Sequence, residues 1–339
     1  MPDTVDFRYA WLAVALLSLI DVGASRAADS FPTVQTTPAG TSVGGWKLDL
    51  SQAGFYRLKI GRFDVTALSD GTIDADTPKL LRNAKPGEVD RLLADAFVKS
   101  FPASINAYLI HLDGRLILVD AGAGGLVGPT LGKLPDALRS TGTLPEQITD
   151  VLITHIHPDH TGGLTAAGRE VFPNATLHID AHELAFWTSK SAAAESPEPN
   201  KSYFAHVDET LAPYVSGQQI KTFAGEAQLF PGLRAIPAYG HTPGHTYYVL
   251  EDGGDKLVFW GDTVHVPDVQ FRDPTITIDF DVDQKRAALQ RARAFADAAK
   301  DGYLVALDHM YFPGIGHLRV DGDHYRWVAL PYVNDATKH

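Results

Sequence analysis

The densest group of potential metal ligands in the chain is a short His/Asp segment. Three histidines and one aspartate fall within six consecutive residues of the run Thr154-His155-Ile156-His157-Pro158-Asp159-His160. The apolar residues 151–154 before it predict a strand, so His155 and His157 point to the same side of an extended backbone. The proline then ends the strand and turns the last two ligands back to the same place. This spacing predicts a metal site rather than a solvated His-rich turn.

The ligand types narrow the choice of ion. The chain has 14 histidines and no cysteine, which excludes disulfides, thiolate nucleophiles, cysteine-bound zinc and iron–sulfur clusters. Imidazole and carboxylate ligands suit borderline divalent ions such as zinc, manganese, cobalt or iron. Four ligands this close exceed the need of one catalytic ion with an open position, and two ions would need further ligands. Loops after the ends of strands often form the site in layered α/β folds. The candidates for further ligands that follow later expected strands are His241, His245, Asp262 and His309.

Hairpins and alternating strands and helices must position these side chains. Residues 55–68 around Gly61 and residues 105–120 around Asp113-Gly114 read as hairpins. Further strands are expected at 176–179, 233–237, 247–250, 257–260 and 303–307, and a mobile loop at 191–202. Helices are expected at 88–99, 131–140, 181–190 and 283–300. The predicted buried faces of two helices are Val89, Leu92, Leu93, Ala96 and Phe97 in the first, and Ala288, Ala292, Phe295 and Ala299 in the last.

The net charge indicates which partners to exclude, and the N-terminal segment indicates where the protein is located. The 339 residues include 29 Lys and Arg against 41 Asp and Glu, a net charge of −12, which argues against a nucleic-acid binder. Residues 9–20 carry no charge, are too short to span a bilayer, and fit the apolar region of a signal peptide. We therefore expect residues 1–27 to be a signal peptide cleaved after Ala27, with a periplasmic or secreted product and no stable membrane span. A lipid-surface anchor and a disordered tail are the alternatives.

Several motifs together resemble those of one known family. They are Leu68-Ser69-Asp70-Gly71, Val119-Asp120-Ala121-Gly122, the His155–His160 run, His241, Gly261-Asp262-Thr263 and His309. The sequence is similar to the metallo-β-lactamase superfamily over about residues 55–325. The resemblance implies an α/β fold, an αββα sandwich with one catalytic domain at residues 51–331. An extended arm at residues 28–50 would precede this domain, and a C-terminal tail at residues 332–339 would follow it.

The resemblance also assigns the ligands to two metal ions, zinc being the first expectation. By it, one ion is held by His155, His157 and His241, the other by Asp159, His160 and His309, and Asp262 bridges them. His245 competes with His241 and would otherwise support the ligands or meet the substrate. His265 and His317 compete with His309. Asp120 is expected to orient a metal-bound histidine, and Asp70 to be a turn residue.

Within the superfamily, the sequence most resembles the methyl parathion hydrolase group with its lactonase and aryl-esterase relatives. Residues 128–132, 295–300 and 312–317 carry this resemblance, which implies an exported, binuclear homodimer. The expected substrate pocket comprises Leu80, Val127, Trp187, Phe204, His265, Ile278 and Phe280. Five of these depart from the pesticide-hydrolysing members and favour lactones and aryl esters over phosphotriesters: Leu80, Val127, His265, Ile278 and Phe280.

The expected reaction is metal-assisted hydrolysis of a small-molecule ester, lactone or phosphotriester. A hydroxide bridging two ions would attack the substrate, with Asp159 and Asp262 as the catalytic carboxylates. Asp159 would orient the hydroxide, and no serine or cysteine nucleophile is needed. Organophosphate triester cleavage as the main activity is the nearest alternative. A metal-storage protein without turnover is the alternative from another class.

Overall fold

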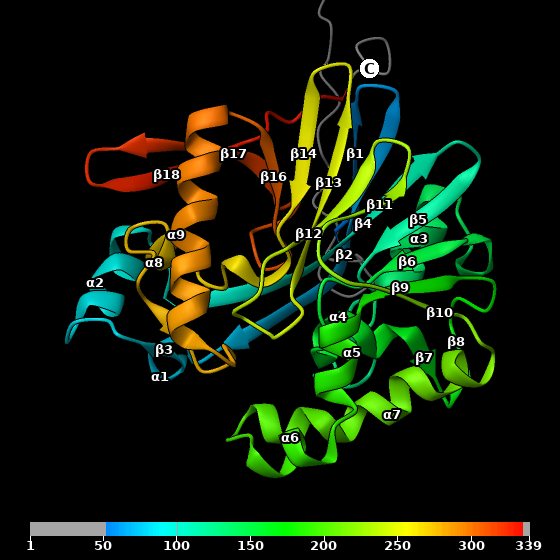
Figure 1. The fold of residues 1–339 in the computed structure, drawn as a ribbon. Coiled ribbons are helices and arrows are strands. Elements are labelled where there is room, and N and C mark those ends of the chain that lie inside the picture. The colour runs from blue at the N-terminus through cyan, green and yellow to red at the C-terminus, as the bar shows by residue number, and fades with distance from the viewer. Residues whose placement is uncertain (1–51, 100, 335–339) are drawn as a thin grey trace, which may run out of the picture. The chain divides into compact units, whose positions relative to one another are not determined.

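A computed structural model describes residues 52–99 and 101–334. The expected signal peptide at 1–27 and the arm at 28–50 lie outside the described residues, as do residues 335–339 of the expected C-terminal tail. The described chain forms two seven-stranded sheets, two short two-stranded sheets, and helices on both outer faces (Figure 1). None of the helices within these residues is long and apolar enough to cross a membrane.

The first sheet begins with hairpins and ends with parallel strands. The expected hairpins form as β1–β2 and β4–β5, while β5, β6, β9 and β10 run parallel. Its order is β1 (Phe55–Ile60), β2 (Phe63–Ala75), β4 (Phe101–Leu112), β5 (Arg115–Val119), β6 (Asp150–Leu152), β9 (Thr176–Asp180) and β10 (Ile220–Phe223).

The second sheet contains the remaining long strands. Its order is β11 (Ala227–Phe230), β12 (Leu233–Pro237), β13 (Thr246–Asp252), β14 (Asp255–Phe259), β16 (Leu304–Ala306), β17 (Ile315–Asp321) and β18 (His324–Ala329). The two short sheets pair β3 (Leu81–Arg82) with β15 (Thr277–Ile278), and β7 (Thr165–Ala166) with β8 (Arg169–Glu170). The strands expected from the sequence are all present, and the structure adds β10, β11, β17 and β18 to the large sheets and all four strands of the short ones.

The main core lies between the two large sheets. Val65, Tyr108 and Val119 of the first sheet join Tyr248 and Phe259 of the second in one buried cluster. The rings of Tyr108 and Phe259 have centroids 5.3 Å apart. Because side chains alternate along a strand, their sequence neighbours point outward, to be covered by helices.

Helices cover the outer face of each sheet. On the first, Leu109 and Leu118 pack in one cluster with Leu138 of α3 (Leu134–Thr141) and Leu211 of α7 (Asn200–Ser216). On the second, Val258 and Val305 pack with Phe295 and Ala298 of α9 (Gln284–Asp301), the orange helix of Figure 1. The order helix, sheet, sheet, helix confirms the predicted αββα architecture.

The other helices are short. They are α1 (Thr77–Leu80), α2 (Glu88–Asp95), α4 (Pro158–Thr161), α5 (Ala181–Trp187), α6 (Lys190–Glu195) and α8 (Pro267–Gln270). Around Phe101, α2, α8, β3 and β15 form a separate apolar cluster that includes Ile278. This cluster supports one wall of the cavity described below.

Three local expectations were wrong. The 191–202 segment is not a loop, because α6 and the start of α7 occupy most of it and the Ser189 side chain caps α6. The 88–99 helix ends at Asp95, and Phe97 is 95% exposed instead of buried. Of the stripe predicted for α9 only Phe295 is buried, and the other buried residues of this helix are Ala287, Arg291, Ala294 and Ala298.

Candidate metal centre

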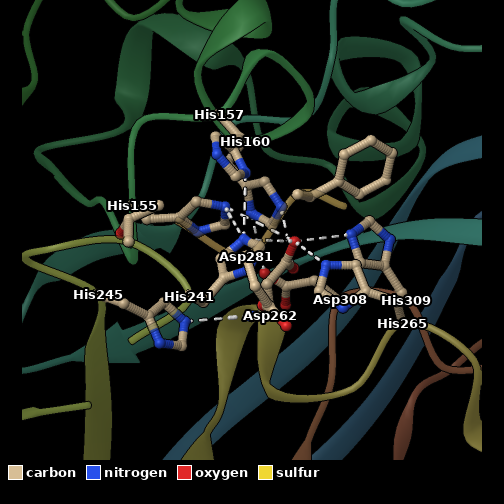
Figure 2. Close-up of polar contacts among 12 residues, drawn as sticks. His155, His157, His160, His241, His245, Asp262, His265, Asp281, Asp308 and His309 are labelled. Carbon is tan, nitrogen blue, oxygen red and sulfur yellow. Dashed lines mark hydrogen bonds and ion pairs between the residues drawn. The ribbon is translucent and has the colours of Figure 1, made fainter. Parts of the chain in front are cut away.

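The predicted ligands lie on loops that follow four strands of the two large sheets. His155 and His157 come just after β6, and Pro158 then starts α4, whose single turn carries Asp159 and His160. His241 follows β12, Asp262 follows β14, and His309 follows β16. The carboxyl ends of these strands gather at one place, as expected for a site in a layered α/β fold. Figure 2 shows the imidazoles directed toward one another around Asp262.

One group of ligand atoms comprises His155, His157, His241 and Asp262, all buried and all within 4.8 Å of one another. The Nε2 atom of His241 lies 3.2 Å from Nε2 of His155 and 3.1 Å from Nδ1 of His157. The Asp262 Oδ2 atom lies 3.4 Å from Nε2 of His241 and 3.6 Å from Nε2 of His155. Three ring nitrogens and one carboxylate oxygen therefore face a common point.

A second group shares Asp262 and adds Asp159, His160 and His309. Nε2 of His160 lies 3.1 Å from Oδ1 of Asp262, and Nε2 of His309 lies 3.1 Å from Oδ2. Asp159 Oδ2 is 3.3 Å from Nε2 of His309 and 3.5 Å from Nε2 of His160. The structure thus brings all seven predicted ligands together, and Asp262 belongs to both groups.

The donor set fits divalent cations. Nε2 of His160 and Oδ1 of Asp262 are buried and, although they lie 3.1 Å apart, neither makes a hydrogen bond among the described residues. Burial, with the neighbouring imidazoles, lowers the pKa values of His155 and His157 well below the ordinary 6.5. These two rings are therefore neutral, with lone pairs available for a metal. At His241 and His309 burial is outweighed by Asp262, which raises their pKa values to about 9, so the His241 and His309 rings would release a proton when a metal binds. Imidazole nitrogens and carboxylate oxygens without cysteine match the borderline ions expected from the sequence.

Two predicted supporting residues contact the ligands from behind. Asp120 Oδ2 lies 2.8 Å from Nδ1 of His160, and the same carboxylate accepts hydrogen bonds from the backbone and hydroxyl of Thr154. His245 Nε2 accepts a hydrogen bond from the backbone N–H of Asp262 at 3.2 Å. His245 is 1% exposed and absent from the cavity wall, so the alternatives in which it binds metal or meets substrate do not fit.

Of the two residues that compete with His309, His317 lies away from the ligands and His265 lies beside them. The His317 side chain hydrogen-bonds to the carbonyl of Gly302, away from the cluster. Asp70 is fully buried and accepts backbone hydrogen bonds from Ala123, Gly132 and Leu134, as a turn residue would. His265 does enter the site, with Nε2 at 3.0 Å from Oδ2 of Asp262.

Sequence analysis missed several carboxylates that touch the ligands or their loops. Asp281 Oδ1 lies 2.8 Å from Nδ1 of His241, and Arg291 approaches the other oxygen at 3.5 Å. Asp308 Oδ2 lies 3.2 Å from Nδ1 of His160. Glu183 accepts hydrogen bonds from the loop of His155 and His157 and from the loop after His241. Asp308 could have been found by its place beside His309. No local signal marks Asp281 or Glu183.

A cavity of about 280 Å³ opens beside the ligands. Its polar side consists of His157, Asp159, Asp262, His265 and His309, and its other walls are mostly apolar, with Asp74 among them. Five of the predicted pocket residues line it: Leu80, Val127, His265, Ile278 and Phe280. Its other lining residues include Ile73, Phe101, Ala103, Ile105, Tyr203 and Val266.

The structure corrects two members of the predicted pocket. Trp187 and Phe204 do not line the cavity, because their rings pack on each other in the core with centroids 4.6 Å apart. Trp187 is 2% exposed and meets the back of His157 at 5.3 Å. Tyr203, the neighbour of Phe204 on α7, faces the cavity instead and lies 5.1 Å from the His157 ring.

Comparison with known proteins identifies the class. Residues 101–311 match the family model of the metallo-beta-lactamase superfamily. The chain belongs to this superfamily, and its two sheets, outer helices and His/Asp cluster are those that the sequence motifs predicted.

Individual relatives give more detail. The crystal structure of the hydrolase AbOPH, described as a beta lactamase superfamily protein, is 35% identical, covers 84% of this chain and 100% of its own, and has a TM-score of 0.80. AidC, a dizinc quorum-quenching lactonase, is 26% identical over 83% of this chain and 99% of its own, with a TM-score of 0.77. An atrochrysone carboxyl ACP thioesterase of Passalora fulva is 26% identical over 220 residues, 63% of this chain. The match spans only 55% of that thioesterase.

Proposed function

We propose that the protein is a metal-dependent hydrolase of uncharged lactones and aryl esters. The observation that carries this proposal is the cavity itself, which places apolar walls directly against both ligand groups. No lysine or arginine is among its lining residues. An apolar cavity with a few convergent polar groups is what a small uncharged substrate requires. The similarity to the lactonase AidC supports the same choice.

The seven clustered residues would hold two divalent ions, for which zinc is the first candidate and manganese, cobalt and iron are alternatives. Such ions supply a Lewis acid for the carbonyl oxygen and lower the pKa of a water molecule from about 16 toward 7. Asp159 lines the cavity and is the most exposed of the seven, with a side chain 20% exposed. Its carboxylate can orient the attacking water and accept the proton released.

The remaining cavity residues select the substrate. Burial lowers the pKa of His265 to about 4, although Asp262 opposes the shift, so this ring is neutral where it faces the cavity. The carboxylates of Asp159 and Asp262 would repel an anionic substrate, and no cationic side chain compensates. Acyl-coenzyme A and acyl-carrier thioesters, which carry phosphates, therefore fit this cavity less well than neutral esters.

Organophosphate triester hydrolysis as the main activity is the second candidate. A triester is also uncharged, so the same apolar walls favour it. Against it, His265 and Phe280 line the cavity with ring centroids 6.0 Å apart. Both depart from the residues expected of the pesticide-hydrolysing members. The proposal also includes a homodimer and an exported, periplasmic or secreted protein, both carried over from the sequence.

The test is a comparison of kcat/KM on purified, metal-loaded protein. Dihydrocoumarin, phenyl acetate, an acyl-homoserine lactone and methyl paraoxon cover the two candidates. We expect a lactone or aryl ester to exceed methyl paraoxon by at least about 100-fold, and Asp262→Ala or His155→Ala to reduce kcat/KM by more than about 100-fold. Asp297→Ala, which removes an exposed carboxylate on α9, should have no effect. A preference for methyl paraoxon would establish the alternative, and metal binding without any turnover would overturn both.

A further inference from the structure

One buried carboxylate near the metal centre has no role in the reaction described above. Glu183 lies in the first turn of α5, is 1% exposed, and accepts four hydrogen bonds. Its Oε1 atom accepts from the backbone of Ile156 at 2.8 Å and from the indole of Trp187 at 2.7 Å. Its Oε2 atom accepts from the hydroxyl of Thr242 at 2.7 Å and from the backbone of Gly244 at 2.8 Å.

Three of these four donors belong to loops that carry metal ligands. Ile156 stands between His155 and His157, while Thr242 and Gly244 follow His241. The two loops are 86 residues apart in sequence, measured from His155 to His241. Glu183 therefore joins the backbones that present all three imidazoles of the first ligand group.

The packing around Glu183 indicates the same arrangement independently of the hydrogen bonds. A Cβ atom on Gly244 would lie 2.3 Å from the Glu183 backbone nitrogen and 2.5 Å from its Cβ. The loop after His241 can approach α5 this closely only because this residue is glycine. One turn further along α5, the Trp187 ring meets the edge of the His157 ring at 5.3 Å.

The second ligand group is held by different residues. Nδ1 of His160 contacts Asp120 at 2.8 Å, and Nδ1 of His309 contacts the carbonyl of Ser104 at 3.0 Å. None of the four donors to Glu183 lies within the 158–161 turn or beside His309. The two groups share Asp262, and Asp120 also accepts hydrogen bonds from Thr154 beside His155, but Glu183 contacts only the loops of the first group.

We propose that Glu183 is a positioning residue that sets the metal affinity of the His155, His157 and His241 group without acting on the second group. The proposal rests on the proposed function only in requiring that the cluster hold two ions. An ionised carboxylate can accept four hydrogen bonds and donates none. A glutamine of the same shape would turn its amide nitrogen toward two of the donors, leaving those buried N–H or O–H groups facing another donor.

The test measures zinc affinity in two single-site backgrounds. His309→Ala disables the second group and leaves the first, whereas His157→Ala disables the first and leaves the second. Zinc binding to the metal-free proteins is measured by competition with a chelator of known affinity. We expect Glu183→Gln to weaken zinc binding by about 10–100-fold in the His309→Ala background and to leave it unchanged in the His157→Ala background. Glu195→Gln, an exposed change on α6, is the matched control and should alter neither.

Two results would overturn the proposal: unchanged zinc affinity in the His309→Ala background, or equal weakening in both backgrounds, which a general loss of structure would produce. If circular dichroism shows that metal-free Glu183→Gln does not fold, Thr242→Val replaces it, since that variant removes one donor and keeps three. It should weaken zinc binding in the same background only, and an unchanged affinity would again overturn the proposal. None of these measurements uses a substrate, so absent ester hydrolysis would reject the proposed function and leave this result standing.

Discussion

An imidazole that binds a metal through one nitrogen needs its other nitrogen held in place, and three ligands here meet that need in different ways. His160 is held by Asp120, His241 by Asp281 and His309 by the carbonyl of Ser104. Each contact fixes the tautomer as well as the ring orientation. Because these contacts are to the protein and not to an ion, they would orient the rings for metal binding and lower its cost.

Asp281→Asn tests this arrangement at His241. The amide would keep the size of the side chain but lose the negative charge that stabilises the Nδ1–H of His241, and it would leave the buried Arg291 without its carboxylate partner. We expect zinc affinity and kcat/KM each to fall by about 10–100-fold. Asp279→Asn is the control, because Asp279 pairs with the partly exposed Arg82 and with none of the metal ligands. Wild-type zinc affinity in Asp281→Asn would contradict the role.

Among the elements, the end of α2 shows strain that the sequence did not predict. Ala96 and Phe97 close the helix with hydrogen bonds back to Leu92 and Ala94. Phe97 adopts a φ of 60°, the left-handed region usually occupied by glycine at this place. Its ring is 95% exposed, so it gains little from burial in exchange.

Phe97→Gly should therefore stabilise the protein. Removing the strain of a left-handed non-glycine residue is worth about 1 kcal/mol, and the exposed ring contributes little that would be lost. The free energy of unfolding from urea titration of the metal-free protein measures the change. Phe97→Ala removes the ring but keeps the strain and should be close to wild type. A destabilised Phe97→Gly variant would show that the ring is buried against something in solution.

The strand that leads into the ligand segment is tied to its neighbours by one carboxylate. Asp150 of β6 contacts His178 of β9 at 2.9 Å and Arg115 of β5 at 2.9 Å, and it accepts a hydrogen bond from Thr149. Burial raises the pKa of Asp150, but these contacts outweigh burial and lower it below the ordinary 3.8. Asp150 thus holds three strands together just before His155.

Asp150→Asn should cost stability in a pH-dependent way. A carboxyl whose folded pKa is depressed stabilises the folded state above its ordinary pKa and loses this contribution as pH falls through the folded value. We expect the variant to be less stable by about 2 kcal/mol between pH 8 and 5, with the difference shrinking below about pH 4. Urea unfolding of the two metal-free proteins across this range measures it. A difference that grows on acidification would contradict the assignment.

For the whole molecule, the metal centre links the two sheets. His155 and His157 extend from the first sheet, whereas His241, Asp262 and His309 extend from the second. Ions bound at this place would connect both halves of the sandwich, so metal binding and folding are thermodynamically coupled.

Chelation should therefore lower the thermal stability as well as abolish hydrolysis. At zinc concentrations 100-fold above Kd, binding to one site adds about 2.7 kcal/mol to the free energy of unfolding. The Tm of protein treated with a chelator should fall by several degrees and rise again with added zinc. Activity should return with zinc, manganese or cobalt. A Tm that does not respond to zinc would show that the ions do not join the two sheets.

The sequence by itself determined those features that depend only on residues close together in the chain. The spacing of His155 to His160 and the proline within it fixed the ligand segment, because alternation along a strand and the limits on proline are local. The hairpin at Asp113-Gly114 and the end of α9 at Gly302 were predictable for the same reason. The family motifs then supplied the distant ligands, which the structure brings together with the first segment.

Only the tertiary structure decided which of two adjacent residues meets the substrate. Tyr203 faces the cavity and Phe204 the core, since the rotation of α7 about its axis is set by packing against the first sheet. The carboxylates that contact the ligands and their loops could not be predicted either. Asp281 lies 40 residues from His241 in sequence, and Glu183 lies 27 residues from Ile156. Contacts between residues so far apart depend on how the sheets and helices pack, and no local pattern of residue types encodes that.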